Sequence, residues 1–153
     1  VAKWDVPAGW STSSEFAIAA DGSVYMEAPG DEFVRLDPDD GSVTATTGAL
    51  AGFGSPRVAI DGAGSVYLSN KSFADGRVYA FTDELQPIWD ASVTNINIGG
   101  PALGRYGTLV VVGNGTIGRA YRLSGALPAC PDLFSDGYET GTTELWSDQE
   151  PAP

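Results

Sequence analysis

One short pattern occurs three times in this chain at nearly equal intervals. Gly22-Ser23-Val24-Tyr25 returns 42 residues later as Gly64-Ser65-Val66-Tyr67. A looser copy, Gly107-Thr108-Leu109-Val110, follows after a further 43 residues. Each copy precedes a second apolar run, and these runs occupy residues 33–36, 78–81 and 120–123. The chain is therefore built from three similar units, and its fold must repeat about every 40 residues.

Each unit consists of short runs of β-forming residues separated by Gly, Asp, Asn and Pro. No segment keeps the apolar spacing of an amphipathic helix over three turns. Strands are expected at residues 15–20, 23–28, 32–37, 42–46, 57–60, 65–69, 77–82, 87–92, 101–104, 107–113 and 118–123. A period of about 40 to 45 residues made of short strands is typical of a β-propeller blade. We therefore predict an all-β fold of three four-stranded antiparallel blades.

The N-terminus is expected to enter this repeat part-way through. Trp4 lies 20 residues before Val24, and Trp89 lies 20 residues before Leu109. Residues 1–6 are therefore predicted to form an outer strand, which completes the third unit as propellers often close. The predicted domain layout is propeller repeats over residues 1–127, followed by a C-terminal tail or added strand over residues 128–153.

Three blades are fewer than the four to eight that close a propeller ring. Open flanks would expose apolar faces and unpaired strand edges, which soluble proteins avoid. We therefore expect part of a larger propeller, a propeller completed by oligomerisation, or flanks covered by a partner protein.

The units resemble the PQQ-like (quinoprotein dehydrogenase-like) β-propeller repeat of bacterial proteins. The resemblance covers about residues 1–125 and rests on residues 21–25, 34–38 and 78–81 together with Trp89. It implies that the recurring Trp, Gly and Tyr residues dock neighbouring blades. Enzymes of this superfamily hold pyrroloquinoline quinone with calcium and an aspartate base over a ring of about eight blades. This chain has fewer blades, no vicinal cysteines and no histidine, so no complete PQQ site is expected.

The C-terminal segment resembles a short motif that recurs in secreted bacterial proteins. Residues 136–139, Gly141 and Trp146 carry the match, with Tyr138 in place of the usual Phe. The resemblance implies a bacterial protein that is secreted, in an extracellular or periplasmic location.

Composition excludes several partners and reactions. Eight Lys and Arg residues against twenty Asp and Glu residues give a net charge of −12, so no nucleic acid partner is predicted. No stretch approaches the roughly 20 apolar residues of a membrane span, and membrane insertion is not predicted. Histidine is absent and Cys130 is the single cysteine. The chain therefore lacks the commonest general base, an internal disulfide and a cysteine-rich zinc site, and we predict no enzymatic activity and no catalytic residues.

Calcium is the metal that the sequence could hold. Asp37, Asp39 and Asp40 place three carboxylates within four residues, and hard cations prefer such oxygen ligands. Aspartates also stabilise turns through hydrogen bonds to their own backbone, and this is the competing interpretation. A second acidic cluster offers the same chemistry and consists of Asp132, Asp136 and Glu139.

The tryptophans divide into two groups by their place in the repeat. Trp4 and Trp89 hold equivalent positions and are interpreted as packing residues. Trp10, Tyr106 and Trp146 fall outside the register, and we predict that they contribute to an interface.

These observations favour a non-catalytic extracellular propeller module that mediates protein–protein association or assembly through its blade edges, with other chains or with copies of itself. One alternative is an extracellular carbohydrate- or calcium-binding module. The other is a fragment of a quinoprotein oxidoreductase.

Overall fold

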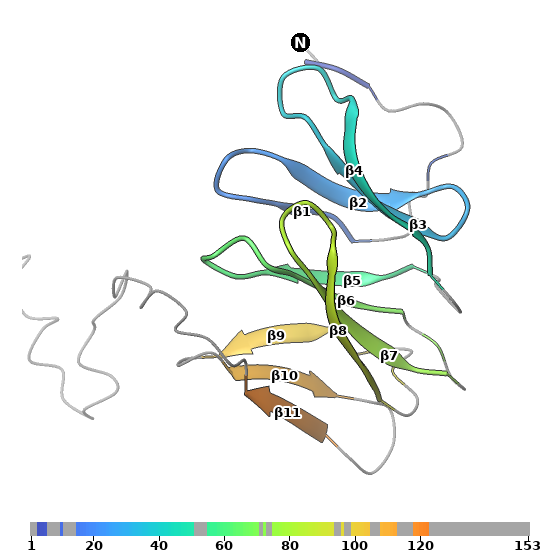
Figure 1. The fold of residues 1–153 in the computed structure, drawn as a ribbon, viewed down its shortest axis with the longest axis vertical. Coiled ribbons are helices and arrows are strands. Elements are labelled where there is room, and N and C mark those ends of the chain that lie inside the picture. The colour runs from blue at the N-terminus through green and yellow to red at the C-terminus, as the bar shows by residue number, and fades with distance from the viewer. Residues whose placement is uncertain are drawn as a thin grey trace, which may run out of the picture.

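The computed structural model of the chain describes residues 3–5, 10, 15–50, 55–70, 72, 75–93, 96, 99–104 and 108–112, and the backbone of residues 118–122. The described residues form eleven strands in three antiparallel sheets, which follow one another in chain order (Figure 1). All eleven strands overlap the ranges expected from the sequence.

The first sheet has four strands in the order β1-β2-β3-β4. They are β1 (Ala17–Ile18), β2 (Val24–Ala28), β3 (Glu32–Leu36) and β4 (Val43–Ala49). Val24 pairs with Leu36, and Met26 pairs with Val34, so these four side chains share one face. The register between β3 and β4 shifts twice, once between Arg35 and Leu36.

The second sheet repeats this arrangement in the order β5-β6-β7-β8. Its strands are β5 (Arg57–Ile60), β6 (Val66–Ser69), β7 (Arg77–Phe81) and β8 (Pro87–Ser92). The register between β7 and β8 shifts between Ala80 and Phe81, so both complete sheets carry an irregularity between their third and fourth strands.

The third sheet has three strands among the described residues, in the order β11-β10-β9. They are β9 (Pro101–Gly104), β10 (Thr108–Val112) and β11 (Gly118–Arg122). The prediction that the N-terminus adds a fourth strand here is wrong for residues 3–5. These residues form no strand, and they contact the first sheet instead, because Trp4 Nε1 donates a hydrogen bond to the Pro38 carbonyl oxygen.

The repeated glycines form equivalent turns between the first two strands of their sheets. Gly22 has a φ of 89° and Gly64 a φ of 90°, in the left-handed region that glycine tolerates. The N–H of Gly22 donates to the Ala19 carbonyl, and the N–H of Gly64 donates to the Asp61 carbonyl. In the first two sheets, the sequence repeat is thus a repeat of one turn geometry.

Each sheet has two faces. The trailing face is the one on the side of the next sheet in chain order, and the leading face is the opposite one, which in the second and third sheets is turned toward the sheet before. The trailing face of the first sheet carries Tyr25 and Phe33, which pack against Val66 and Leu68 of the second sheet. A second core joins the second and third sheets and includes Tyr67, Val78, Ala80, Leu109 and Val111. The hydrophobic core therefore lies between the sheets.

The first strands of the sheets, β1, β5 and β9, lie next to one another in that order (Figure 1). Sheets that pack face to face around a common line of first strands are the arrangement of propeller blades. The predicted all-β fold is confirmed. No helix long and apolar enough to cross a membrane occurs in the part of the chain that the structure describes.

Candidate interaction surface

The leading face of the first sheet is an apolar surface with no sheet before it among the described residues. Ile18 pairs with Val24, and Leu36 pairs with Val43, so all four side chains lie on this face. The apolar residues of the leading face are Ile18, Val24, Met26, Ala28, Val34, Leu36 and Val43.

Two tryptophans cover the centre of the leading face. Trp4 and Trp10, which we call the tryptophan cap, pack against a cluster that contains Val34 and Leu36. Trp4 also lies over Gly41, where an added Cβ would come within 2.7 Å of the indole ring. Trp10, a predicted interface residue, is therefore half-buried on the leading face.

The margins of the leading face stay exposed. Ile18 is 63% exposed at the β1 side, and Val43 is 51% exposed at the β4 side. Phe16, just before β1, is 66% exposed. The residue equivalent to Ile18 in the second sheet is Ile60, which packs partly buried against the first core. At the side of the first strand, the leading face of the first sheet is thus less completely covered than that of the second.

The trailing face of the third sheet is the opposite flank. Leu109 and Val111 of β10 are fully buried against the second sheet, whereas Val112 is 53% exposed. Because side chains alternate along a strand, Val110 and Val112 point away from the second sheet. The other predicted interface residues, Tyr106 and Trp146, lie outside the described residues.

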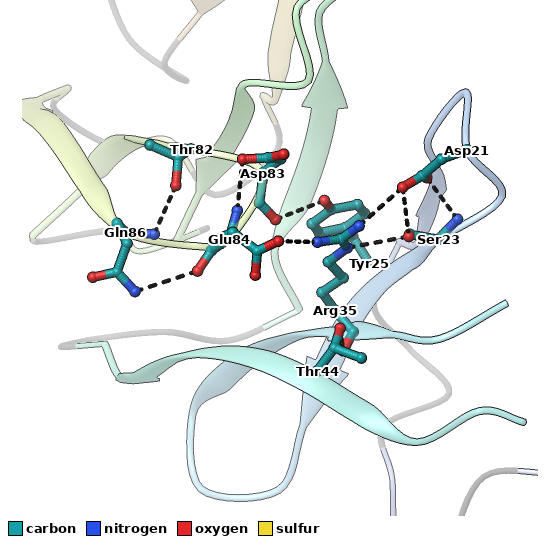
Figure 2. Close-up of polar contacts among 9 residues, drawn as sticks. All are labelled: Asp21, Ser23, Tyr25, Arg35, Thr44, Thr82, Asp83, Glu84 and Gln86. Carbon is teal, nitrogen blue, oxygen red and sulfur yellow. Dashed lines mark hydrogen bonds and ion pairs between the residues drawn. The ribbon is translucent and has the colours of Figure 1, made fainter.

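A polar junction joins the first two sheets at one end (Figure 2). The Arg35 guanidinium on β3 lies 2.9 Å from Asp21 and 2.5 Å from Glu84, which belongs to the turn between β7 and β8. Arg35 Nε also donates a hydrogen bond to Ser23 Oγ. The arginine side chain is only 17% exposed, so this network is partly shielded from solvent.

The Tyr25 hydroxyl forms the second polar contact of the junction. Tyr25 donates to the carbonyl oxygen of Asp83 in the second sheet, at 2.8 Å (Figure 2). Tyr67, the equivalent residue, donates instead to Asp61 Oδ2 within its own sheet, also at 2.8 Å. Burial, together with the hydrogen bond to Asp61, raises the pKa of Tyr67 to about 12.

A pocket of about 360 Å³ opens beside Arg35. Two carboxylates of its lining already hold the arginine, so the polar groups act mainly as a contact between sheets. No aromatic side chain that could stack on a sugar ring occurs among the lining residues. These are Asp21, Ser23, Arg35, Asp37, Pro38, Thr44 and Glu84.

The predicted calcium ligands Asp37, Asp39 and Asp40 occupy the turn between β3 and β4. Asp37 accepts a hydrogen bond from the N–H of Asp39, and Asp40 accepts one from the N–H of Ser42. No group of three metal-binding side chains comes together among the described residues. The second predicted cluster, Asp132, Asp136 and Glu139, lies outside them. Calcium binding stays a prediction.

Comparison with solved structures identifies the architecture. The crystal structure of BamB from Moraxella catarrhalis matches with a TM-score of 0.56 and 21% sequence identity. The match covers 72% of this chain and 37% of the BamB chain, so this chain spans well under half of that protein. The three sheets are propeller blades. No protein-family model and no curated protein matches the sequence.

The likeness to part of the BamB propeller establishes the fold only. The function has to be argued from the surfaces of this chain. On the propeller, the tryptophan cap lies where a preceding blade would pack. The sequence did not indicate the Arg35 junction, because its partners come from different blades. The exposed Ile18 was also missed, although its equivalence to Ile60 is readable from the repeat.

Proposed function

We propose that this chain is a non-catalytic propeller module that associates with protein chains through its two blade flanks, the leading face of the first blade and the trailing face of the third. The observation that carries the proposal is the 63% exposure of Ile18 on the leading face of the first blade, because its counterpart in the second blade, Ile60, packs partly buried against the first core.

The energy available at such a face is considerable. Removing an Ile or Val side chain from water contributes roughly 1.5–3 kcal/mol, so Ile18, Val43 and Phe16 together supply a useful apolar anchor. Exposed apolar groups that gather on one face mark interaction sites more often than isolated ones do.

The proposed partners are other protein chains or copies of this chain, outside the cytoplasm of a bacterium. The net charge of −12 argues against nucleic acid. The pocket beside Arg35 gives less support to a carbohydrate binder, because the residues that line it include no aromatic platform.

Light scattering after size exclusion tests the proposal in its self-association form. We expect the mean mass to rise with protein concentration, and Ile18→Asp to reduce that rise. Ile88→Asp is the matched control, because Ile88 is 52% exposed on β8, away from the leading face of the first blade. A one-chain mass at every concentration, or an equal effect of both substitutions, would contradict self-association through this face.

A further inference from the structure

The tryptophan cap occupies the place that a blade occupies elsewhere in the chain. In the second blade, Val66 and Leu68 on the leading face pack against Tyr25 and Phe33 of the blade before. In the third blade, Leu109 and Val111 pack in the same way against the second blade. In the first blade, the equivalent surface packs against Trp4 and Trp10.

Among the described residues, the cap makes few polar contacts in addition to its packing. Lys3 pairs with Asp39, but their side chains are 62% and 88% exposed, and pairs as exposed as this contribute little stability. The Trp4 side chain donates a 3.1 Å hydrogen bond from Nε1 to the Pro38 carbonyl oxygen. Both tryptophans are only partly buried, so the cap should be easier to displace than a blade.

This chain itself carries a surface that could replace the cap. The leading faces of the second and third blades each pack on the trailing face of the blade before, and the trailing face of the third blade ends in the exposed Val112. The third blade of another copy would therefore offer the first blade the kind of surface that its own successors use. Two copies would bring together six of the blades that the structure describes, and closed propellers have four to eight.

We propose that the tryptophan cap is an intramolecular substitute for a neighbouring blade, and that its displacement lets the leading face of the first blade dock on the trailing face of the third blade of a second copy. This inference rests on the proposed function. It names the partner, which is a second copy of the chain, and the element that regulates the association, which is the tryptophan cap. The docking is heterologous, so it gives a closed ring where the geometry closes and a filament where it does not.

Gly41→Ala displaces the cap without touching the blade core. The new Cβ would meet the Trp4 ring at 2.7 Å, and the φ of 74° adds a backbone cost. Gly48→Ala is the matched control, because Gly48 has a φ of 66° in the same sheet and nothing within 4 Å of the added Cβ. Both variants carry a similar backbone cost, but only the first disturbs the cap.

The measurement is the mean mass of the full chain by light scattering, with circular dichroism and iodide quenching of tryptophan fluorescence on the same samples. We expect the tryptophans of Gly41→Ala to become more accessible to iodide. We also expect this variant to reach at least the mass of two chains at concentrations where Gly48→Ala behaves like the original chain. Adding Val112→Asp to Gly41→Ala should return the mass to that of the original chain. Since both partners are acidic, the association should strengthen with added salt.

Three results would overturn the inference. They are an unchanged mass of Gly41→Ala despite increased quenching, an equal mass increase in Gly48→Ala, and no reversal by Val112→Asp. Should Gly41→Ala fail to fold, Trp4→Ala with Trp10→Ala replaces it, and a peptide of residues 1–10 added in trans should lower the mass of that variant. An inactive peptide would count against the cap. A reduced mass for Ile18→Asp with no effect of Gly41→Ala would leave the proposed function standing and remove only this inference.

Discussion

Tyr25 and Tyr67 hold the same position in successive blades, yet Tyr25 donates its hydroxyl across the junction to Asp83 and Tyr67 donates to Asp61 within its own blade. The second arrangement places a phenol and a carboxylate side by side in a site where Tyr67 is 4% exposed and Asp61 is 9% exposed. The hydrogen bond is therefore sensitive to ionisation of the phenol.

We predict that Tyr67 makes stability fall at alkaline pH. Its folded-state pKa is about 12 against an unfolded value of 10.0, so the folded state binds the proton more tightly. The contribution is complete below pH 10 and is lost as the pH rises toward 12, by roughly 2–3 kcal/mol. Urea unfolding across this range should show a shallower decline for Tyr67→Phe than for the original chain. Equal slopes would contradict the assignment.

Arg35 should contribute more to stability than an arginine pair confined to one blade. Its guanidinium bonds to Asp21 and Ser23 in its own blade and to Glu84 across the junction. Because it is only 17% exposed, Arg35→Met should cost about 1–3 kcal/mol. Arg77→Met is the control, because Arg77 is 44% exposed and pairs with Asp90 in its own sheet. That loss should stay below about 1 kcal/mol. Chemical unfolding compares the two, and similar losses would refute the special role of Arg35.

Glu27 is expected to destabilise the folded chain. It is 8% exposed on the trailing face of the first blade, and its Oε2 atom has no hydrogen-bond partner among the described residues. An unpaired buried carboxylate costs free energy, so Glu27→Gln should raise Tm at neutral pH. Glu32→Gln serves as the control, since Glu32 accepts a hydrogen bond from Thr46 and is less buried. A lower Tm for Glu27→Gln would show that the carboxylate has a stabilising partner.

Calcium at the turn between β3 and β4 would raise Tm, because a ligand that binds only the folded state stabilises it by mass action. The rise should disappear with EDTA and in Asp39→Asn, which removes a carboxylate without changing the backbone. Asp21→Asn is a control outside the turn. An unchanged Tm with added calcium would discard this site.

The fold was predictable from the sequence because its determinants are local. The glycine turns at Gly22 and Gly64 and the alternating apolar residues beside them set the strands and their order along the chain. The position of Trp4 was not predictable. Trp4 and Trp89 have equivalent places in the repeat, but this equivalence does not indicate that Trp4 bonds to the Pro38 carbonyl and lies over Gly41. The Arg35 junction could not be predicted from the sequence either, because Glu84 lies 49 residues away in the chain and contacts Arg35 only when the blades pack together.

The register shifts between the third and fourth strands of the first two blades affect how such modules can aggregate. An irregular outermost pair twists the edge strand and interrupts the even row of backbone donors and acceptors that an incoming strand needs. The edges at β4 and β8 are therefore poor templates for amyloid-like strand addition. Crowded chains should meet through side chains on the broad sides of their sheets, in contacts that dilution can reverse.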